Sequence, residues 1–268
     1  MRKLPAGAAF GHALSSTFDN LGFAFHVSWP WILVMLPVQL VGNLYLAANG
    51  LLEPDPDNPD GRYFAVIFLL GVVSILAFSS IAVSWHRYIL RDEVPQGWQR
   101  LRLDGTVWRY IGNVILSFLA MFAVVFAGAL PLGALAFVLG PTGGGGVTML
   151  VAIFVGALMC IAMVIFYRLS IKLPAVALER RDFGFPDAWR AAAGNDLRIL
   201  ALILLFFLTI FVVGMATAII VTLLGNTLGS AGLAVAIAVQ VVVNWISTIV
   251  GVTLLTSLYG FFVEGRDF

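Results

Sequence analysis

The sequence predicts an all-α integral membrane protein, a single transmembrane domain over residues 1–268 that forms a bundle of six transmembrane helices. Three observations predict this fold class. First, 61% of the residues are hydrophobic and only 11% are charged, whereas a soluble domain carries about 25% charged residues. Second, the apolar residues form six runs long enough to cross a bilayer. Third, the basic residues gather in alternate connections between these runs.

The six runs are read as helices because a spanning helix needs roughly 20 mostly apolar residues. None of them shows the regular alternation that is typical of a strand in a transmembrane barrel. Several are longer than the minimum, which permits a tilted helix. The predicted spans cover residues 27–50, 63–88, 110–139, 147–170, 198–224 and 232–262.

The basic residues predict the orientation of the chain. The N-terminal segment, the connections between spans 2 and 3 and between spans 4 and 5, and the C-terminal segment hold 14 of the 15 Lys and Arg residues. Only Arg62 lies in a connection on the other side, and the residues around it are acidic. Because connections rich in Lys and Arg stay in the cytoplasm, both termini are expected there.

Three further segments are expected to form short amphipathic helices at the cytoplasmic membrane surface. They precede the odd-numbered spans and cover residues 10–25, 98–111 and 186–198. In the first of them, apolar residues recur every three or four positions, which is one face of a helix. In the other two, arginines stand among tryptophans and aliphatic residues, so the charged groups can reach the lipid headgroups while the helix lies in the interface.

The chain also shows signs of a three-fold internal repeat. Glu93, Glu179 and Glu264 follow the even-numbered spans at separations of 86 and 85 residues. We therefore predict three units, each an amphipathic helix plus a helical hairpin. A ring of three such units would place span 6 beside span 1. The possible units are residues 1–93, 94–179 and 180–268.

Uncharged amides are the polar groups found at depth in the predicted spans. Gln39 and Asn43 lie one turn apart in span 1, and Gln240 and Asn244 lie one turn apart in span 6. If the two spans are neighbours, Gln39 approaches the depth of Asn244. The amides then either join the helices by hydrogen bonds or line a polar cavity for a headgroup or small solute. No acidic or basic residue falls in the central part of any span, which weakens the prediction of a coupled pump.

The stretch "SSIAVSWHRYILRDEVP", residues 79–95, ends an apolar run in a cluster of polar residues. The simpler interpretation is the rim where a helix leaves the lipid, with aromatic residues at the interface and arginines at the headgroups. The sharper interpretation is a basic pocket that binds an anionic lipid headgroup or a membrane-protein partner. The residues of that pocket would be His86, Arg87, Arg91, Arg168 and Lys172.

No motif for catalysis or metal binding stands out in the sequence. The three histidines, His12, His26 and His86, lack partners at metal-ligand spacing, and the single cysteine, Cys160, lies in an apolar run. No nucleophile is found beside a base. We expect no catalytic residue, no metal and no cofactor. The net charge of +1 gives no reason to expect a nucleic-acid partner.

The segments "WHRYILRDE", "LRLDGTVWRYIGN" and "LSIKLPAVALE…AWRAAAGN" carry a resemblance to a known group of proteins. Together they resemble uncharacterised bacterial six-helix inner-membrane proteins. These are similar in turn to the membrane domain of some glycerophosphodiester phosphodiesterases. The resemblance implies a location in the bacterial inner membrane and six helices. It transfers no catalytic residue, because the soluble barrel of those enzymes has no counterpart here.

The preferred function is a non-enzymatic membrane protein that binds lipid, or a membrane-protein partner, through its cytoplasmic basic rim. One alternative is a transporter or channel for a small neutral or amphipathic solute between spans 1 and 6. The other is a lipid-modifying enzyme that uses His86 as acid or base.

Overall fold

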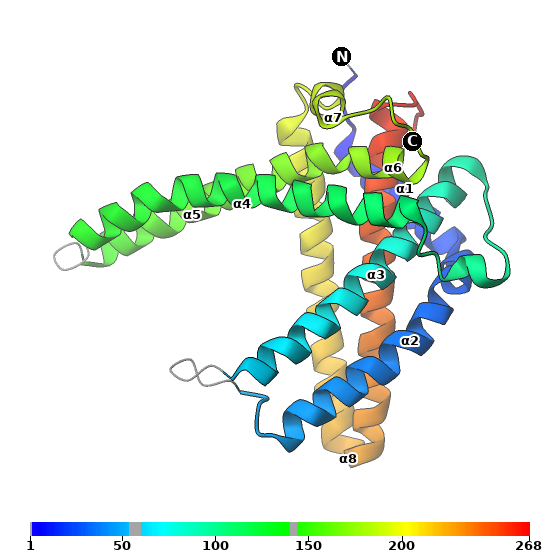
Figure 1. Cartoon of the computed structure of the whole chain (residues 1–268). Helices are drawn as coiled ribbons and strands as arrows, with labels where there is room; N and C mark the ends of the chain where they lie inside the picture. The colour runs from blue at the N-terminus through cyan, green and yellow to red at the C-terminus, as the bar shows by residue number, and fades with distance from the viewer. Residues whose placement is uncertain (1, 54–59, 140–143) are drawn as a thin grey trace.

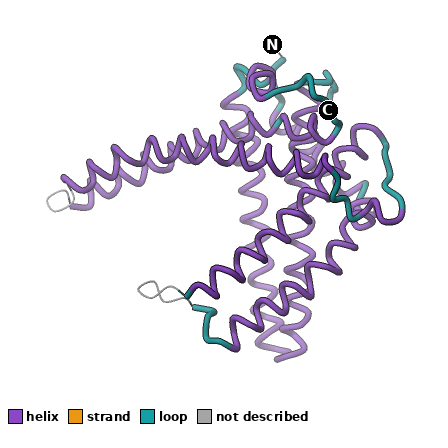
Figure 2. The backbone as a smooth tube through the Cα atoms, in the orientation of Figure 1, coloured by secondary structure: helices purple, strands orange, loops and turns teal. Residues whose placement is uncertain are grey.

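The computed structural model describes residues 2–53, 60–139 and 144–268, and all regular elements in this part of the chain are helical (Figure 2). The all-α class is therefore confirmed. The helices are α1 (Ala6–Asp19), α2 (Leu21–Ala48), α3 (Gly61–Arg91), η1 (Gly97–Arg100), α4 (Gly105–Leu139), α5 (Gly144–Ser170), α6 (Lys172–Ala177), α7 (Phe185–Ala191) and α8 (Asp196–Phe262).

Six helical segments are long and apolar enough to cross a membrane, as the sequence predicts, and the chain is an integral membrane protein. The helix α8 supplies two of them, because its two halves run side by side in Figure 1 as the yellow and the orange-to-red rods. The segments are Leu21–Ala48, Gly61–Arg91, Gly97–Ala134, Thr148–Ala177, Asp196–Thr227 and Ala238–Phe262.

The spans form three hairpins that meet at one end and diverge at the other (Figure 1). The first hairpin is α2 with α3, the second is α4 with α5, and the third is the two halves of α8. At the common end, which we call the hub, α1 packs along α8, and α3 contacts both α4 and α8. Both chain termini lie at the hub as well.

The buried core lies in the hub, with contributions from all three hairpins. Trp85 of α3, Tyr110 of α4, Ile171 before α6 and Tyr259 of α8 are fully buried there. Towards the far ends of the hairpins, large apolar side chains such as Phe126 and Phe211 are exposed instead. Lipid is the expected partner of these exposed side chains, because exposure of so many of them to water is rare in soluble proteins.

The predicted surface helices differ in extent from the structure. The segment 10–25 is divided at Asn20 into α1 and the start of α2, and 186–198 becomes the short helix α7 and the start of α8. The prediction of one helix over 98–111 is wrong: a single 3₁₀ turn is followed by a break and then by α4. Asp104 causes the break, because its Oδ1 accepts hydrogen bonds from the backbone N–H groups of Thr106 and Val107 at 2.9 and 3.2 Å, which begins a new helix.

Two structural details recur at the predicted repeat distance. Gly42 of α2 lets Leu70 of α3 pack closely against the helix backbone, and Gly128 of α4 does the same for Leu158 of α5. The two glycines are 86 residues apart and the two leucines 88. The even-numbered spans are also followed by residues with positive φ, namely Asp92, Glu179 and Gly265. These positions fit the predicted period, and the division into three units remains a prediction.

Candidate functional site

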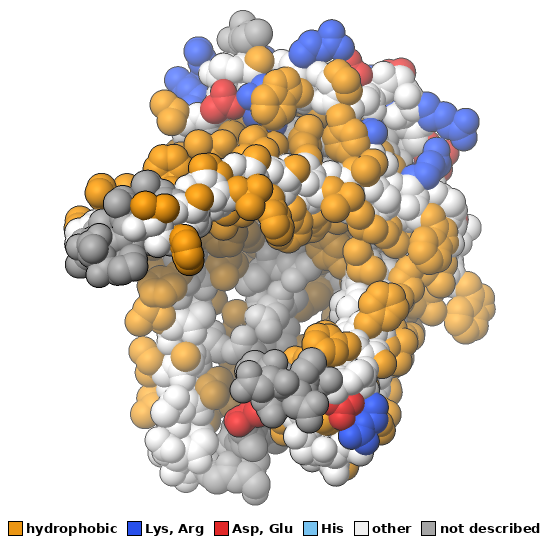
Figure 3. Space-filling view, turned by 60° about the vertical axis from the view of Figure 1, so that its left-hand side comes forward, with side chains coloured by type: hydrophobic (Ala, Val, Ile, Leu, Met, Phe, Trp, Pro, Cys, Tyr) orange, Lys and Arg blue, Asp and Glu red, His pale blue; other side chains and the backbone are white. Residues whose placement is uncertain are grey.

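Charged side chains separate the two ends of the molecule. In the space-filling view, Lys and Arg gather at the hub end, above rods that are covered by hydrophobic side chains (Figure 3). At the opposite end, Arg62 pairs with Asp60, the residue that caps the start of α3. The hub end is therefore the basic end of the molecule, where the interface between lipid headgroups and water would lie.

His86, the first residue of the predicted basic pocket, lies inside the hub and is fully buried. Its Nδ1 lies 2.8 Å from Thr256 Oγ1 of α8, and its Nε2 lies 3.1 Å from the Tyr110 hydroxyl of α4. Thr256 Oγ1 already donates to the Val252 carbonyl, so it accepts from Nδ1–H, and Nε2 accepts from Tyr110. Both ring nitrogens are occupied, and His86 joins the three hairpins.

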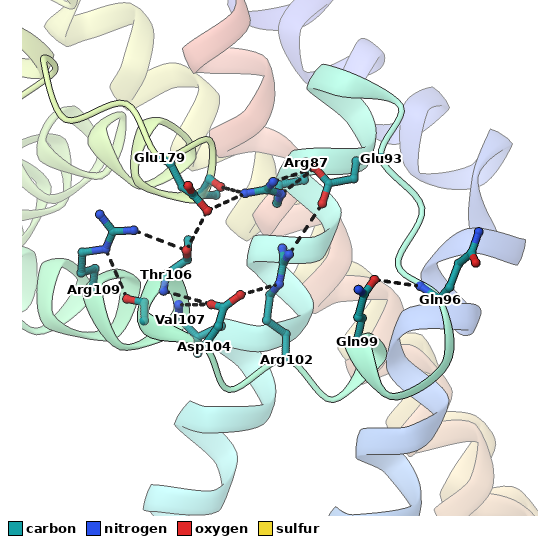
Figure 4. Close-up of polar contacts among 12 residues, drawn as sticks. Arg87, Glu93, Gln96, Gln99, Arg102, Asp104, Thr106, Val107, Arg109 and Glu179 are labelled. Carbon is teal, nitrogen blue, oxygen red and sulfur yellow. Dashed lines mark hydrogen bonds and ion pairs between the residues drawn. The ribbon is translucent and has the colours of Figure 1, made fainter.

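Arg87 takes part in a network of polar contacts at the start of α4 (Figure 4). It donates to Glu93 at 2.8 Å, to the Ala177 carbonyl at 3.1 Å and to Glu179 at 3.2 Å. Glu179 also accepts from the hydroxyl of Thr106 at 3.1 Å. The hydrogen bond from Arg87 lowers the pKa of Glu93 below its ordinary value. Arg87 thus holds together the ends of α3 and α6 and the start of α4.

Arg168 is engaged elsewhere, at the packing of α5 against α7 and α8. Its guanidinium lies 3.7 Å from the ring centre of Trp189 and pairs with Asp196 at 2.6 Å. The Arg168 side chain is only 7% exposed. An arginine in this position holds α5 against α7 and α8, and little of its surface remains accessible to a ligand.

Lys172 and Arg91 complete the predicted set. Lys172 lies 4.0 Å from the ring centre of Phe185, and Arg91 is exposed at the C-terminal end of α3. The five residues therefore occupy separate surroundings and do not line one pocket. Lys172 is the member that belongs to a groove with other basic residues.

This groove, which we call the basic groove, lies between the start of α4 and the segment from α6 to residue 184. Its volume is about 660 Å³. The positive φ of Glu179 reverses the chain after α6, and the Arg180 N–H donates to the Ala175 carbonyl at 2.9 Å to close the turn. This turn places two further arginines beside the groove. The basic residues that line it are Arg109, Lys172, Arg180 and Arg181.

The basic residues of the groove differ in how strongly they are held. Arg180 donates to the Tyr259 hydroxyl at 3.0 Å and pairs with Asp182 at 2.9 Å. Arg109 donates to the Gly105 carbonyl at 3.2 Å, within its own helix. Glu179 also lines the groove, but it is already bonded to Arg87. The groove therefore keeps a surplus of positive charge around Lys172, Arg109 and Arg181.

The four predicted intramembrane amide residues are joined in pairs by hydrogen bonds within their own helices. Asn43 donates to the Gln39 carbonyl at 2.8 Å within α2, and Gln240 donates to Asn244 at 3.1 Å within α8. In the described part of the chain, no hydrogen bond joins an amide side chain of α2 to one of α8. Gln39 and Asn244 nevertheless line the same groove, and Asn43 and Gln240 are not among its lining residues.

A second polar pocket was not predicted from the sequence. It lies at the hub between α1, the end of α3 and the end of α8, and its volume is about 290 Å³. His12 lies there with Nδ1 3.1 Å from Ser257 Oγ, and Asn20 accepts from the Tyr88 hydroxyl at 2.9 Å. Burial, and to a smaller degree the charge of Arg266, lowers the pKa of His12. These contacts join residues far apart in the chain, which leaves no local sequence signal.

Among the residues that the structure describes, no group of three or more His, Cys, Asp or Glu side chains is placed to hold a metal ion. Comparison of the chain with protein-family models, with characterised proteins and with solved structures finds no match. The arrangement of the side chains is therefore the basis for a functional proposal.

Proposed function

We propose that this chain is a non-enzymatic protein of the bacterial inner membrane that binds an anionic lipid headgroup in the basic groove, with the basic end and both termini in the cytoplasm. The observation that supports the proposal is the gathering of Arg109, Lys172 and Arg181 around one groove at the basic end. Juxtamembrane basic pockets of this kind attract anionic lipids, at about 1 kcal/mol for each Lys or Arg.

The chemistry of the groove favours binding over catalysis. None of the described residues that line it is a serine, threonine, cysteine or histidine. Its basic groups can donate several hydrogen bonds to the oxygens of a phosphate, and such charge-assisted bonds are stronger than neutral ones.

The test uses the full-length protein in detergent and native mass spectrometry. Dioleoylphosphatidylglycerol, which is anionic, is titrated against dioleoylphosphatidylcholine, which is zwitterionic. We expect the wild type to prefer the anionic lipid. The double variant Lys172→Ala/Arg181→Ala removes two positive charges, so its preference for phosphatidylglycerol over phosphatidylcholine should fall roughly 30-fold.

The matched control is Arg62→Ala, which removes a positive charge at the opposite end of α3. This variant should bind phosphatidylglycerol as the wild type does. Equal binding of the two lipids by the wild type would contradict the proposal, and so would an equal loss in the control variant.

A further inference from the structure

A second groove, which we call the tryptophan groove, lies within the membrane-spanning region between α2, α3 and the second half of α8. Its volume is about 450 Å³. Trp31 of α2 and Trp245 of α8 line it together with Ser28, and Gln39 and Asn244 line it further along. Most of its other lining residues are apolar, such as Ile32, Leu36 and Val241.

Three hydrogen-bond donors of this groove have no partner among the described residues. They are the hydroxyl of Ser28 and the indole N–H groups of Trp31 and Trp245, and all three polar atoms are buried. Ser28 is fully buried and Trp31 is only 5% exposed. A buried donor without an acceptor is unfavourable, and it is more so where lipid rather than water surrounds the helices.

Two other hydroxyls that line this groove do have a partner, whereas the buried hydroxyls of Ser79, Ser80 and Ser84 of α3 lack one as Ser28 does. Ser74 and Thr248 line the same groove, and each donates to the carbonyl four residues earlier in its own helix, at 2.7 and 2.8 Å. This bond is the usual one for a hydroxyl within a helix. Ser28 does not make it, and an indole N–H can only donate. Three residues that line the groove therefore carry donors without an acceptor among the described residues.

The surroundings of the donors define what could supply the acceptors. The ring of Trp245 packs edge-on against Phe25, with centres 6.4 Å apart, so Trp245 lies level with the first turns of α2, near the basic end. The first turns of a spanning helix lie near the ester groups of the adjacent leaflet, between the headgroups and the acyl chains. Water would satisfy the donors but would leave the apolar lining exposed to it.

We propose that the tryptophan groove binds a glycerolipid, with its ester carbonyls accepting from Trp31, Trp245 and Ser28 and its acyl chains against the apolar lining. This site is separate from the basic groove, and it recognises the ester region of the lipid and not the charge of the headgroup. A zwitterionic lipid therefore tests it independently of the function proposed above.

The experiment compares two phosphatidylcholines that differ only in their acceptors. Dioleoylphosphatidylcholine has two ester carbonyls, and its diether analogue has none. Binding of each to the full-length protein in detergent is measured by native mass spectrometry. We expect the wild type to bind the diester more tightly, by about fivefold for each indole hydrogen bond, which corresponds to about 1 kcal/mol.

The variants Trp31→Phe and Trp245→Phe keep an aromatic ring and remove the N–H. Each should reduce the preference for the diester about fivefold and leave binding of the diether unchanged. Trp29→Phe, an exposed position on α2 outside the groove, is the control and should retain the full preference. Size-exclusion profiles and thermal unfolding establish that the variants are folded.

Equal binding of diester and diether by the wild type would overturn the proposal. An unchanged preference in both tryptophan variants would overturn it as well. If a variant does not fold, indole ¹⁵N–¹H signals of the wild type in nanodiscs of the two lipids replace it. The signals of Trp31 and Trp245 should differ between the lipids, and identical signals would refute the site.

Discussion

The Nδ1 atom of His86 lies 2.8 Å from the Oγ1 atom of Thr256, although 170 residues separate them in the chain. With the Tyr110 hydroxyl on its other side, His86 joins the three hairpins at the point where they converge. The sharper interpretation of the sequence placed this imidazole at a basic surface pocket. Its surroundings indicate that it orients the helices within the hub.

Thr256→Val should destabilise the protein, because it leaves the Nδ1–H of His86 buried without an acceptor. The expected loss is about 1–3 kcal/mol in the free energy of unfolding. Thermal unfolding in detergent measures it. Thr222→Val is the control, since Thr222 is exposed on α8 and bonds only within its own helix. Comparable losses in the two variants would show that the His86 contact contributes little.

Arg168→Lys should also lower stability, by about 2 kcal/mol. A lysine cannot stack on Trp189 and reach both Asp196 and the Trp189 carbonyl, as the planar guanidinium does. Arg190→Ala, which breaks an exposed ion pair within α7, should change stability by less than about 0.5 kcal/mol. Denaturation of both variants side by side tests the contrast, and a lysine variant as stable as the wild type would contradict it.

Gly128→Val should displace the Leu158 side chain from its packing, because even a Cβ at this position would lie 2.6 Å from Leu158 Cδ1. Overpacking of this kind costs about 1–3 kcal/mol. The second change Leu158→Ala makes room and should recover part of the loss. Gly214→Val, at a position with open space around it, is the control. Thermal unfolding of the wild type, Gly128→Val, Leu158→Ala and the double variant gives the coupling energy between the two positions. Additive effects of the two changes would argue against the close contact.

Protonation of His12 should destabilise the fold. Its pKa is lowered in the folded protein by burial and by Arg266, so the unfolded chain binds the proton more readily. The stabilising contribution is therefore complete above about pH 6.5, the ordinary value, and is lost as the pH falls through the lower folded value. Unfolding temperatures measured from pH 8 to pH 5 should decline less in His12→Gln. An identical decline in both proteins would assign the effect to other groups.

The proposed orientation can be tested by cysteine labelling. In a Cys160→Ser background, Arg62→Cys and Arg190→Cys place one thiol at each end of the molecule. A membrane-impermeant maleimide applied to spheroplasts, which lack the outer membrane, should label position 62 directly and position 190 only after the inner membrane is permeabilised. The reverse pattern would place the basic end outside the cell.

The six spans were predictable because their length and composition are local properties of the sequence. The basic end of the molecule was predictable as well, since the Lys and Arg residues gather in alternate connections between the spans. The break within residues 98–111 was not predictable, because it depends on the side chain of Asp104, which begins a new helix there. A period in apolar residues does not reveal such a capping group.

The candidate sites were less accessible to prediction, because their partners are distant in the chain. Arg87 and Arg168 looked equivalent as basic residues near the ends of spans, yet Glu179 and Asp196 engage them from later helices. The basic groove depends on the reversal at Glu179, which brings Arg181 beside the start of α4. The unpartnered indoles can be recognised only when the neighbours of each N–H are known.

The divergence of the hairpins has a consequence for the surrounding bilayer. The helix α4 has 35 residues, which corresponds to about 52 Å along its axis, whereas the hydrocarbon layer is about 30 Å thick. A helix of this length must lean in order to stay immersed, and a hairpin held only at one end is free to do so. The protein should therefore occupy a wide area in the membrane plane, with acyl chains between its three hairpins. This area should decrease in a thicker membrane.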